Sequence, residues 1–220
     1  MKKTSDGSTK SYIFDIDGTL LDSMGLWADV DASFLRKRNI AEAPDYSKAI
    51  ISMNLGEAAI YTIERFGLRE NADDIVREWK AMAASAYESS IEMKPYAKEY
   101  LDAIRTRGLK MAVATSLPAE LYTPALSAHG LMGYFTAVCS TEDVKRGKTH
   151  PDVYLYAAEK LGAALPDCIV FEDILTAVRS AKRAGTTVYA MYDAASAADW
   201  PQMAKEADGA FYDFNSAPQP

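Results

Sequence analysis

The stretch Tyr12-Ile13-Phe14-Asp15-Ile16-Asp17-Gly18-Thr19-Leu20 joins a short apolar run to two aspartates and a glycine. The apolar part predicts a buried strand, and the aspartates follow at its carboxyl end. Residues two apart on a strand point to the same side, so Asp15 and Asp17 present two carboxylates side by side. Gly18 leaves the backbone open to a ligand because it has no side chain. Oxygen-rich side chains beside open backbone suit a hard cation and an anion that it bridges.

The composition is that of an ordinary globular protein, with 220 residues of which 49% are hydrophobic and 25% charged. This length allows one large domain, or one domain that carries a smaller insert. The net charge of -7 disfavours nucleic acid and anionic membrane surfaces as partners. An anionic substrate stays possible, because a metal ion and one lysine can reverse the sign of the charge locally.

Several features indicate a cytoplasmic protein with reduced thiols. No apolar run approaches the length of a membrane span. Met1–Lys10 is polar, which is typical of a leader segment and not of a secretory signal. Cys139 and Cys168 are far apart in apolar runs, so we expect two buried free thiols.

Residues 24–93 show helical spacing of apolar side chains and no convincing strand. The apolar positions predict three helices, near Val30, Ile63 and Trp79, and Gly67 ends the second of them. Pro44-Asp45 is expected to break the chain. This part of the sequence therefore predicts an all-helical block.

From Pro95 onward, short apolar strands alternate with helices. Strands are expected at 111–114, 135–139, 168–171, 187–191 and 210–212. The alternation predicts an α/β fold with a Rossmann-like doubly wound parallel sheet, covered by helices on both faces. Because the helical block interrupts the pattern after the first strand, we expect a core domain of residues 1–22 and 95–220 with an inserted helical cap domain at 23–94.

Polar side chains follow three of the expected strands, where open parallel sheets bind their ligands. Each residue alone has a structural explanation, such as a helix N-cap for Asp173. Their order at one edge of one sheet favours a function: carboxylates for a magnesium ion, hydroxyls for a phosphoryl group, and one cation. These are the components of phosphoryl transfer. The candidates are Asp15, Asp17, Thr115, Ser116, Lys148, Glu172 and Asp173.

The same segments resemble the four ordered motifs of the haloacid dehalogenase superfamily. The resemblance spans the whole chain, including a helical cap inserted after the first motif, and it is nearest to the branch of small-molecule phosphatases and β-phosphoglucomutases. The matching segments are Asp15-Ile16-Asp17-Gly18-Thr19-Leu20, Thr115-Ser116, Gly147-Lys148-Thr149-His150-Pro151-Asp152 and Phe171-Glu172-Asp173-Ile174.

The resemblance implies a magnesium-dependent phosphatase that acts on a small phosphorylated metabolite. It implies that Asp15 attacks the phosphorus and forms an aspartyl-phosphate, whereas Asp17 protonates the leaving oxygen and later activates water. Two adjacent carboxylates repel each other, so we expect a raised pKa for Asp17.

The resemblance also implies the ligands of the metal and the phosphoryl group. Magnesium is expected at Asp15, the backbone carbonyl of Asp17 and Asp173, with Glu172 nearby or ligating. Gly18 and one hydroxyl are expected to hold the phosphoryl group, and Lys148 to neutralise it. The end of the second strand favours Thr115 over Ser116 as that hydroxyl. The expected substrate contacts from the cap are Met24, Trp27, Met53 and Asn54.

Other activities of the same fold stay open. A β-phosphoglucomutase-like phosphosugar mutase is the main alternative, but residues 49–63 contain no lysine or arginine to hold a second phosphate, and residues 22–27 contain no histidine. Lys48 and Lys80 lack a recognisable context for a Schiff base, which disfavours a phosphonatase. A binding protein without turnover would be expected to carry a broken motif, and no motif is broken here.

Overall fold

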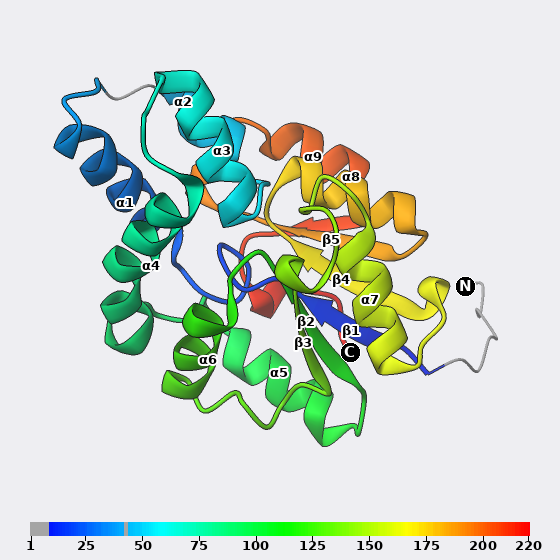
Figure 1. The fold of residues 1–220 in the computed structure, drawn as a ribbon. Helices are drawn as coiled ribbons and strands as arrows, with labels where there is room; N and C mark the ends of the chain where they lie inside the picture. The colour runs from blue at the N-terminus through cyan, green and yellow to red at the C-terminus, as the bar shows by residue number, and fades with distance from the viewer. Residues whose placement is uncertain (1–8, 42–43) are drawn as a thin grey trace.

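A six-stranded parallel sheet lies at the centre of the computed structural model, which describes residues 9–41 and 44–220 (Figure 1). The strands run in the spatial order β3-β2-β1-β4-β5-β6, so the first strand of the chain is central. The predicted doubly wound parallel sheet is confirmed. Most of the polar leader, residues 1–8, lies outside the described residues. The strands are β1 (Ser11–Phe14), β2 (Met111–Thr115), β3 (Ala137–Ser140), β4 (Cys168–Glu172), β5 (Thr187–Met191) and β6 (Gly209–Phe211).

Alternating side chains of β1 pack into two separate hydrophobic clusters, one on each face of the sheet. Tyr12 and Phe14 belong to one cluster, and Ile13 belongs to the other. In the register, Phe14 pairs with Val113 of β2 and with Phe171 of β4. Asp15, the next residue after Phe14, therefore leaves the sheet between the carboxyl ends of two neighbouring strands.

Helices cover both faces of the sheet, as parallel strands require. Those on the Phe14 side are α5 (Ala97–Thr106) and α6 (Ala119–Ala128). Those on the Ile13 side are α7 (Asp152–Leu161), α8 (Leu175–Ala184) and α9 (Trp200–Glu206). Gly162 and Gly185 follow α7 and α8 with positive φ, which ends each helix in the left-handed conformation.

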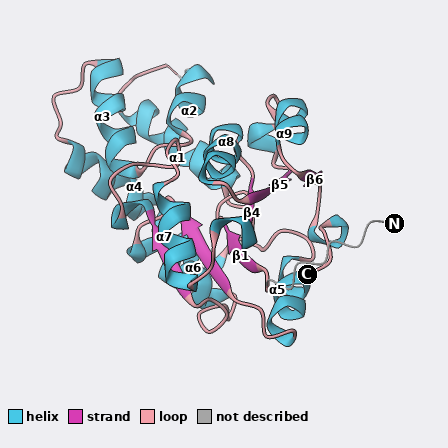
Figure 2. Cartoon of the chain, turned by 90° about the vertical axis from the view of Figure 1, so that its right-hand side faces the viewer, coloured by secondary structure: helices cyan, strands magenta, loops and turns pink. Residues whose placement is uncertain are grey.

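Four further helices form a layer beside the carboxyl edge of the sheet, seen at the upper left of Figures 1 and 2. They are α1 (Met24–Lys37), α2 (Pro44–Ile50), α3 (Leu55–Phe66) and α4 (Ala72–Ser89). The three predicted helices are confirmed as α1, α3 and α4, and Gly67 ends α3 with a φ of 63°.

The prediction that Pro44-Asp45 breaks the chain was wrong, because Pro44 begins the helix α2. A proline fits the first turn of a helix, where its missing N–H would have had no helical partner. The helix α9 was not predicted from the sequence, and β3 was placed slightly early, since the strand starts at Ala137.

The chain leaves the sheet for the helical layer and returns to it at one place. The backbone N–H of Lys94 donates to the carbonyl of Leu20 over 2.8 Å, and Asp22 N–H donates to the carbonyl of Glu92 over 2.9 Å. Lys94 Nζ also lies 3.0 Å from Asp22 Oδ1. One hydrophobic cluster continues from the sheet into the helical layer, through residues such as Leu21 and Trp79. The division into a core of 1–22 and 95–220 and a cap of 23–94 stays a prediction.

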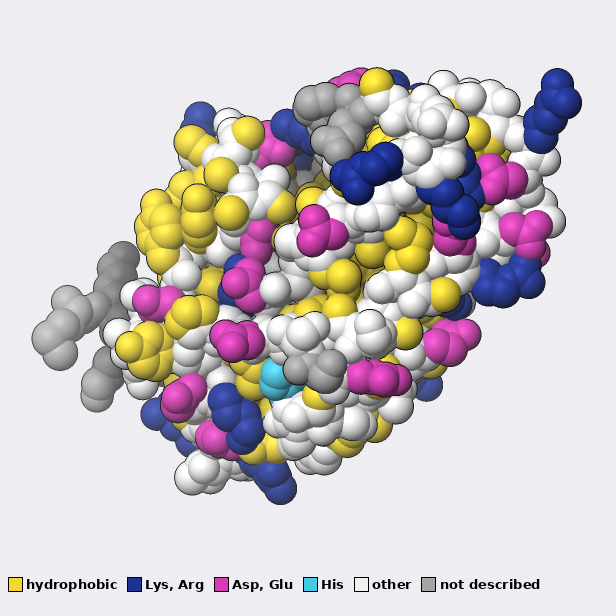
Figure 3. Space-filling view, turned by 90° about the vertical axis from the view of Figure 1, so that its left-hand side faces the viewer, with side chains coloured by type: hydrophobic (Ala, Val, Ile, Leu, Met, Phe, Trp, Pro, Cys, Tyr) yellow, Lys and Arg dark blue, Asp and Glu magenta, His cyan; other side chains and the backbone are white. Residues whose placement is uncertain are grey.

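The two cysteines are buried and free, as expected. Within the described residues, no helix combines the length and the apolar character needed to cross a bilayer. On the face seen in Figure 3, basic and acidic side chains are interspersed and no large field of one sign appears. The expected absence of a nucleic-acid partner stays a prediction.

Candidate active site

The catalytic candidates from three of the four motifs meet at the carboxyl edge of the sheet. Lys148, from the loop before α7, is 2% exposed, and its Nζ lies 2.6 Å from Asp15 Oδ1 and 2.7 Å from Glu172 Oε1. Tyr154 of α7 donates a hydrogen bond to the same Glu172 oxygen over 2.7 Å. Lys148 therefore joins the nucleophile candidate at the end of β1 to the carboxylate at the end of β4.

Asp15, Glu172 and Asp173 form a buried carboxylate cluster whose oxygens lie within 4.8 Å of one another. Glu172 Oε2 and Asp173 Oδ2 are buried and have no hydrogen-bond partner among the described residues. Burial raises the pKa of Asp173 well above its ordinary value, and the charges of Asp15 and Glu172 raise it further. Burial also raises the pKa of Glu172 to about 7, although Lys148 opposes this shift.

A divalent cation fits this cluster. Unpaired buried carboxylate oxygens are costly unless a cation or a proton compensates them, and hard cations such as Mg²⁺ prefer oxygen ligands. The unpartnered oxygens of Glu172 and Asp173 favour compensation by a bound cation. The carboxylate of Asp17 is not part of the cluster. The expected metal ligand at this residue is its backbone carbonyl, and that role stays a prediction.

Gly18 makes room for Asp173 at the centre of the site. Its φ of +73° is one that side-chain-bearing residues rarely adopt, and a Cβ at this position would lie 2.1 Å from Asp173 Oδ2. Thr19 is fully buried and donates a hydrogen bond to Asp173 Oδ1 over 3.4 Å. The first motif and the fourth motif thus interlock through a contact that only glycine permits.

Asp17 faces the helical layer and is held there by two hydroxyl groups. Ser23 Oγ and Tyr87 OH each donate to Asp17 Oδ1 over 2.5 Å, and Trp27 Nε1 donates to the Tyr87 hydroxyl over 2.7 Å. Burial raises the pKa of Asp17 to about 6, with the charge of Asp15 as the second cause. The predicted direction of the pKa shift is confirmed, but burial contributes more than the repulsion on which the prediction was based.

The two hydroxyl candidates of the second motif lie in different surroundings. Thr115 is fully buried, and its hydroxyl accepts a hydrogen bond from the Leu117 N–H over 3.0 Å. Ser116 lines the cavity beside Asp15 and Lys148. The structure therefore gives Ser116 direct access to a ligand, whereas Thr115 shapes the turn after β2.

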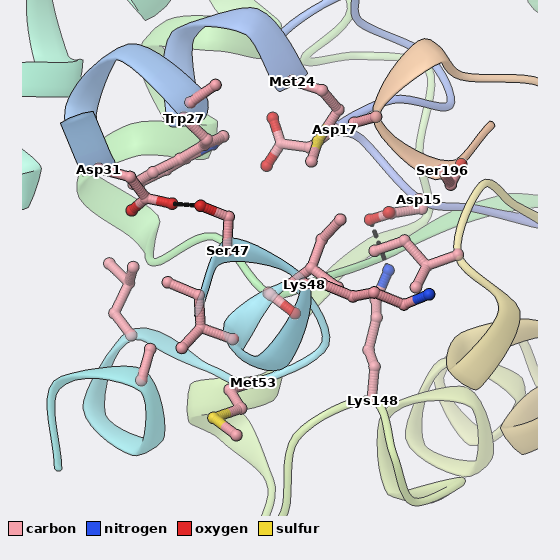
Figure 4. A pocket seen from close by; sticks show the side chains of 18 of the residues that line it. Asp15, Asp17, Met24, Trp27, Asp31, Ser47, Lys48, Met53, Lys148 and Ser196 are labelled. Carbon is pink, nitrogen blue, oxygen red and sulfur yellow. Dashed lines mark hydrogen bonds and ion pairs between the residues drawn. The ribbon is translucent and has the colours of Figure 1, made fainter. Parts of the chain in front are cut away.

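A cavity of about 340 Å³ opens between the carboxylate cluster and the helical layer (Figure 4). On the side of the helical layer, its walls are mostly apolar side chains from α1, α2, α3 and the α2–α3 connection, with Trp79 from α4. Three of the four expected cap contacts line it: Met24, Trp27 and Met53. Asn54 instead caps α3, because its side chain accepts the Glu57 N–H over 2.8 Å while Glu57 Oε2 accepts the Asn54 N–H over 3.0 Å.

Glu57 also connects the helical layer to the loop that carries Lys148. Its Oε1 accepts a hydrogen bond from the backbone N–H of Gly147 over 3.2 Å, directly before Lys148. A Cβ at Gly147 would lie 2.4 Å from Glu57 Oε2, so a larger residue there would have to displace the Glu57 side chain.

Several polar residues at the cavity were not predicted from the sequence. Asp31 of α1 and Ser47 of α2 lie at the wall opposite the carboxylate cluster, and Lys48 and Asp199 form an ion pair of 3.0 Å between α2 and the start of α9. The sequence contained a signal for Asp31, because Met24, Trp27 and Asp31 follow helical spacing along one face of α1. Tyr87 had no such signal, since it belongs to the buried face of α4.

Comparison with known proteins agrees with this site. The family described as Haloacid dehalogenase-like hydrolase matches residues 12–191, which include all four motifs. Hexitol phosphatase A from Escherichia coli is 30% identical over 196 residues, covering 88% of this chain and 87% of that protein. The bifunctional riboflavin kinase/FMN phosphatase from Arabidopsis thaliana is 28% identical over 180 residues, covering 81% of this chain. The chain matches only 47% of the length of the Arabidopsis protein.

The fold is also found in a solved structure. CbbY from Rhodobacter sphaeroides, crystallised with xylulose-1,5-bisphosphate, superposes with a TM-score of 0.84 at 20% identity, covering 95% of this chain and 96% of that chain. The four ordered motifs, the parallel sheet and the extent of the family match agree with one another. The chain belongs to the haloacid dehalogenase-like hydrolases.

Proposed function

We propose that this protein is a magnesium-dependent phosphatase that hydrolyses a small phosphate monoester through an aspartyl-phosphate on Asp15. The observation that carries the proposal is the position of Lys148, 2.6 Å from Asp15 Oδ1 and 2.7 Å from Glu172 Oε1, beside a cavity that Asp15, Asp17 and Ser116 also line. The relatives whose names describe phosphatases support the same reaction.

In the first step, a carboxylate oxygen of Asp15 attacks the phosphorus, and the bond to the alcohol oxygen breaks. Asp17 gives its proton to that oxygen, and a pKa of about 6 suits a group that must carry a proton and later accept one near neutral pH. Lys148 compensates charge on the phosphoryl oxygens, and Ser116 donates a hydrogen bond to one of them.

In the second step, Asp17 removes a proton from a water molecule that attacks the phosphorus of the aspartyl-phosphate. The P–O bond to Asp15 breaks, inorganic phosphate leaves, and the carboxylate is restored. Asp15, Glu172, Asp173 and the carbonyl of Asp17 would hold Mg²⁺, which supplies further charge neutralisation when it is bound. The apolar walls of the cavity keep bulk water away from the reacting atoms.

The decisive assay measures inorganic phosphate release from p-nitrophenyl phosphate and from a panel of phosphorylated metabolites, with Mg²⁺ and with EDTA. We expect turnover with Mg²⁺ only, and none from Asp15→Asn. A folded protein that releases no phosphate from any substrate with Mg²⁺ would instead be a binding protein on this fold, and the proposal would be wrong.

A phosphosugar mutase is the second candidate, and one observation favours it. Lys48 lies just outside the stretch 49–63, and it lines the cavity as a basic residue of the helical layer. Its side chain is 63% exposed and is already paired with Asp199, which weakens it as a holder of a second phosphate. Glucose 6-phosphate formed from β-glucose 1-phosphate with a bisphosphate primer, without release of free phosphate, would establish the mutase.

A further inference from the structure

The cavity has two chemically different ends. Asp15, Lys148 and Ser116 surround the end where the phosphoryl group reacts. Asp31 and Ser47 lie at the opposite side, where Ser47 Oγ donates a hydrogen bond to Asp31 Oδ2 over 2.8 Å (Figure 4). A substrate bound at the first end would extend its leaving group toward the second.

The spacing along α1 gives the length of this path. Met24, whose Cγ lies 3.1 Å from the position of a Cβ on Gly18, marks the reacting end. Asp31 follows Met24 by seven residues on the same face, which is a rise of about 10 Å along the helix. The walls between them include Trp27 and Met53, so the middle of the leaving group contacts apolar surface. A six-carbon alcohol in extended form spans about 9 Å from its ester oxygen to its terminal oxygen, which is close to this distance.

Asp31 is a carboxylate without a cation. It is half-buried, and the described residues give it no ion pair, only the hydrogen bond from Ser47. Burial raises its pKa to about 6, and Ser47 opposes this shift only in part. A half-buried carboxylate of this kind is stabilised by a ligand that brings O–H or N–H donors, and it repels a ligand that brings a second negative charge.

The cationic residues at the cavity do not reverse this preference. Lys148 is engaged by Asp15 and Glu172, and Lys48 is paired with Asp199 at 3.0 Å, with 63% of its side chain exposed. An anionic leaving group would have to displace Asp199 from Lys48 while it lies near the charge of Asp31.

We propose that Asp31 and Ser47 form the subsite for the far end of the leaving group, selecting phosphate monoesters of uncharged or cationic alcohols with a terminal O–H or N–H donor. Leaving groups that end in a carboxylate or a second phosphate are rejected. This inference rests on the proposed phosphatase reaction, and it adds the substrate class.

The test compares phosphate release from three six-carbon monoesters that differ only at the far end: sorbitol 6-phosphate (hydroxyl), glucamine 6-phosphate (ammonium) and 6-phosphogluconate (carboxylate). We expect the wild type to prefer either donor-bearing ester over 6-phosphogluconate by about 10-fold or more in kcat/KM. The ratio between the first two substrates identifies the donor as hydroxyl or ammonium.

Asp31→Asn is expected to lower kcat/KM for the preferred ester about 10- to 100-fold and to narrow its advantage over 6-phosphogluconate. Ser47→Ala changes the same ratio in the same direction by a smaller factor, and it serves as a second variant. Asp29→Asn is the matched control, because Asp29 is an exposed aspartate of the same helix outside the cavity lining, and it leaves the ratio unchanged.

Two results would overturn the inference alone. One is a wild type that hydrolyses 6-phosphogluconate as fast as the donor-bearing esters. The other is an Asp31→Asn variant that preserves the substrate ratio, including the case where all three rates fall by one factor. Failure of the proposed function is distinguishable, since a wild type without the reaction also releases no phosphate from p-nitrophenyl phosphate with Mg²⁺.

Discussion

The hydroxyl of Tyr87 donates a hydrogen bond to Oδ1 of Asp17 over 2.5 Å, and the two residues are 70 positions apart in the chain. Tyr87 lies on α4 in the helical layer, whereas Asp17 follows the central strand of the sheet. The proposed acid–base residue is thus oriented by the part of the protein that also forms the wall of the substrate cavity. Trp27 fixes the tyrosine in turn, through its hydrogen bond of 2.7 Å.

Tyr87→Phe removes this hydrogen bond and keeps the ring. We expect kcat for p-nitrophenyl phosphate to fall about 10-fold with a smaller change in KM, because the lost hydrogen bond orients a charged group that acts during turnover. Steady-state kinetics at saturating Mg²⁺ measures both constants. Tyr96→Phe, at a tyrosine that is 52% exposed, is the control and keeps wild-type kinetics. Unchanged kcat in Tyr87→Phe would remove Tyr87 from the positioning of Asp17.

Asp15 and Asp17 are expected to fail at different steps when each is changed to asparagine. Asp15→Asn forms no phosphoenzyme, because the nucleophile is gone. Asp17→Asn still accepts the phosphoryl group from an aryl ester, whose leaving group needs no proton, but loses about 10²- to 10⁴-fold in turnover. Acid-quenched protein after reaction with ³²P-labelled aryl phosphate distinguishes the two. Label on Asp15→Asn, or an equal lack of label on both variants, would contradict this division of roles.

Gly18→Ala is expected to damage the site more than the fold. The added Cβ would lie 2.1 Å from Asp173 Oδ2 at a φ of +73°, so the carboxylate must move. Because a shift of about 1 Å at reacting groups costs on the order of 100-fold, kcat/KM should fall by at least that factor. Unfolding free energy should fall by at least about 1 kcal/mol in chemical denaturation.

Gly25→Ala is the matched control for this variant. Gly25 is seven residues further along, in α1, and nothing lies within 4 Å of a Cβ there. The alanine should stabilise the helix by about 0.5–1 kcal/mol and leave kcat/KM unchanged. If both variants behaved alike, the contact between Gly18 and Asp173 would have no special importance.

Magnesium should stabilise the wild type measurably. At a concentration of 100 Kd the gain is about 2.7 kcal/mol, which for a chain of this size raises Tm by about 5–10 °C. In EDTA, Asp173→Asn should melt above the wild type, because it removes a carboxylate whose pKa is raised by burial and further by the charges of Asp15 and Glu172. Adding Mg²⁺ should raise the Tm of Asp173→Asn far less than it raises the Tm of the wild type. Equal Mg²⁺-dependent shifts in both proteins would exclude Asp173 from the metal site.

Asp31→Asn should stabilise the protein more at pH 7.5 than at pH 4.5, where only part of the cost of the charge is present. The pKa of Asp31 is raised from 3.8 to about 6 by burial, so the folded protein binds a proton more tightly than the unfolded chain. The resulting cost to stability is absent below pH 4, grows between pH 4 and 6, and is complete above pH 6. Because the pKa rises from 3.8 to about 6, removing the charge should add about 3 kcal/mol at pH 7.5. Urea unfolding at pH 7.5 and 4.5 checks this, and a pH-independent difference would contradict the shift.

The motifs could be placed from the sequence because each is local, and three of the four follow a strand of the parallel sheet directly. Once the strands are aligned, Asp15 and Glu172 must lie at neighbouring ends, and the structure brings them together through Lys148. Because β1 pairs with both β2 and β4, the residues that follow those two strands lie on either side of Asp15.

Contacts from the helical layer were harder to predict. The positions of Tyr87 and Asp31 depend on how α4 and α1 rotate over the sheet, which long-range packing decides and local spacing does not. Asn54 is a different case. Asn54-Leu55-Gly56-Glu57 matches the pattern of a capping box, which is visible in the amino-acid sequence alone. That pattern favours a helix cap over a substrate contact at Asn54.

The central place of β1 also determines when the site can form as the chain is synthesised. β1 ends at Phe14, but its two partner strands begin only at Met111 and Cys168. A nascent chain therefore holds β1 without its partner strands while residues 15–110 are made. Asp15, the nucleophile candidate, is therefore made about 157 residues before Glu172 and Asp173, its partners in the carboxylate cluster. The carboxylate cluster cannot assemble until residue 173 has emerged, and a chain that stops before β4 leaves one edge of β1 open to aggregation.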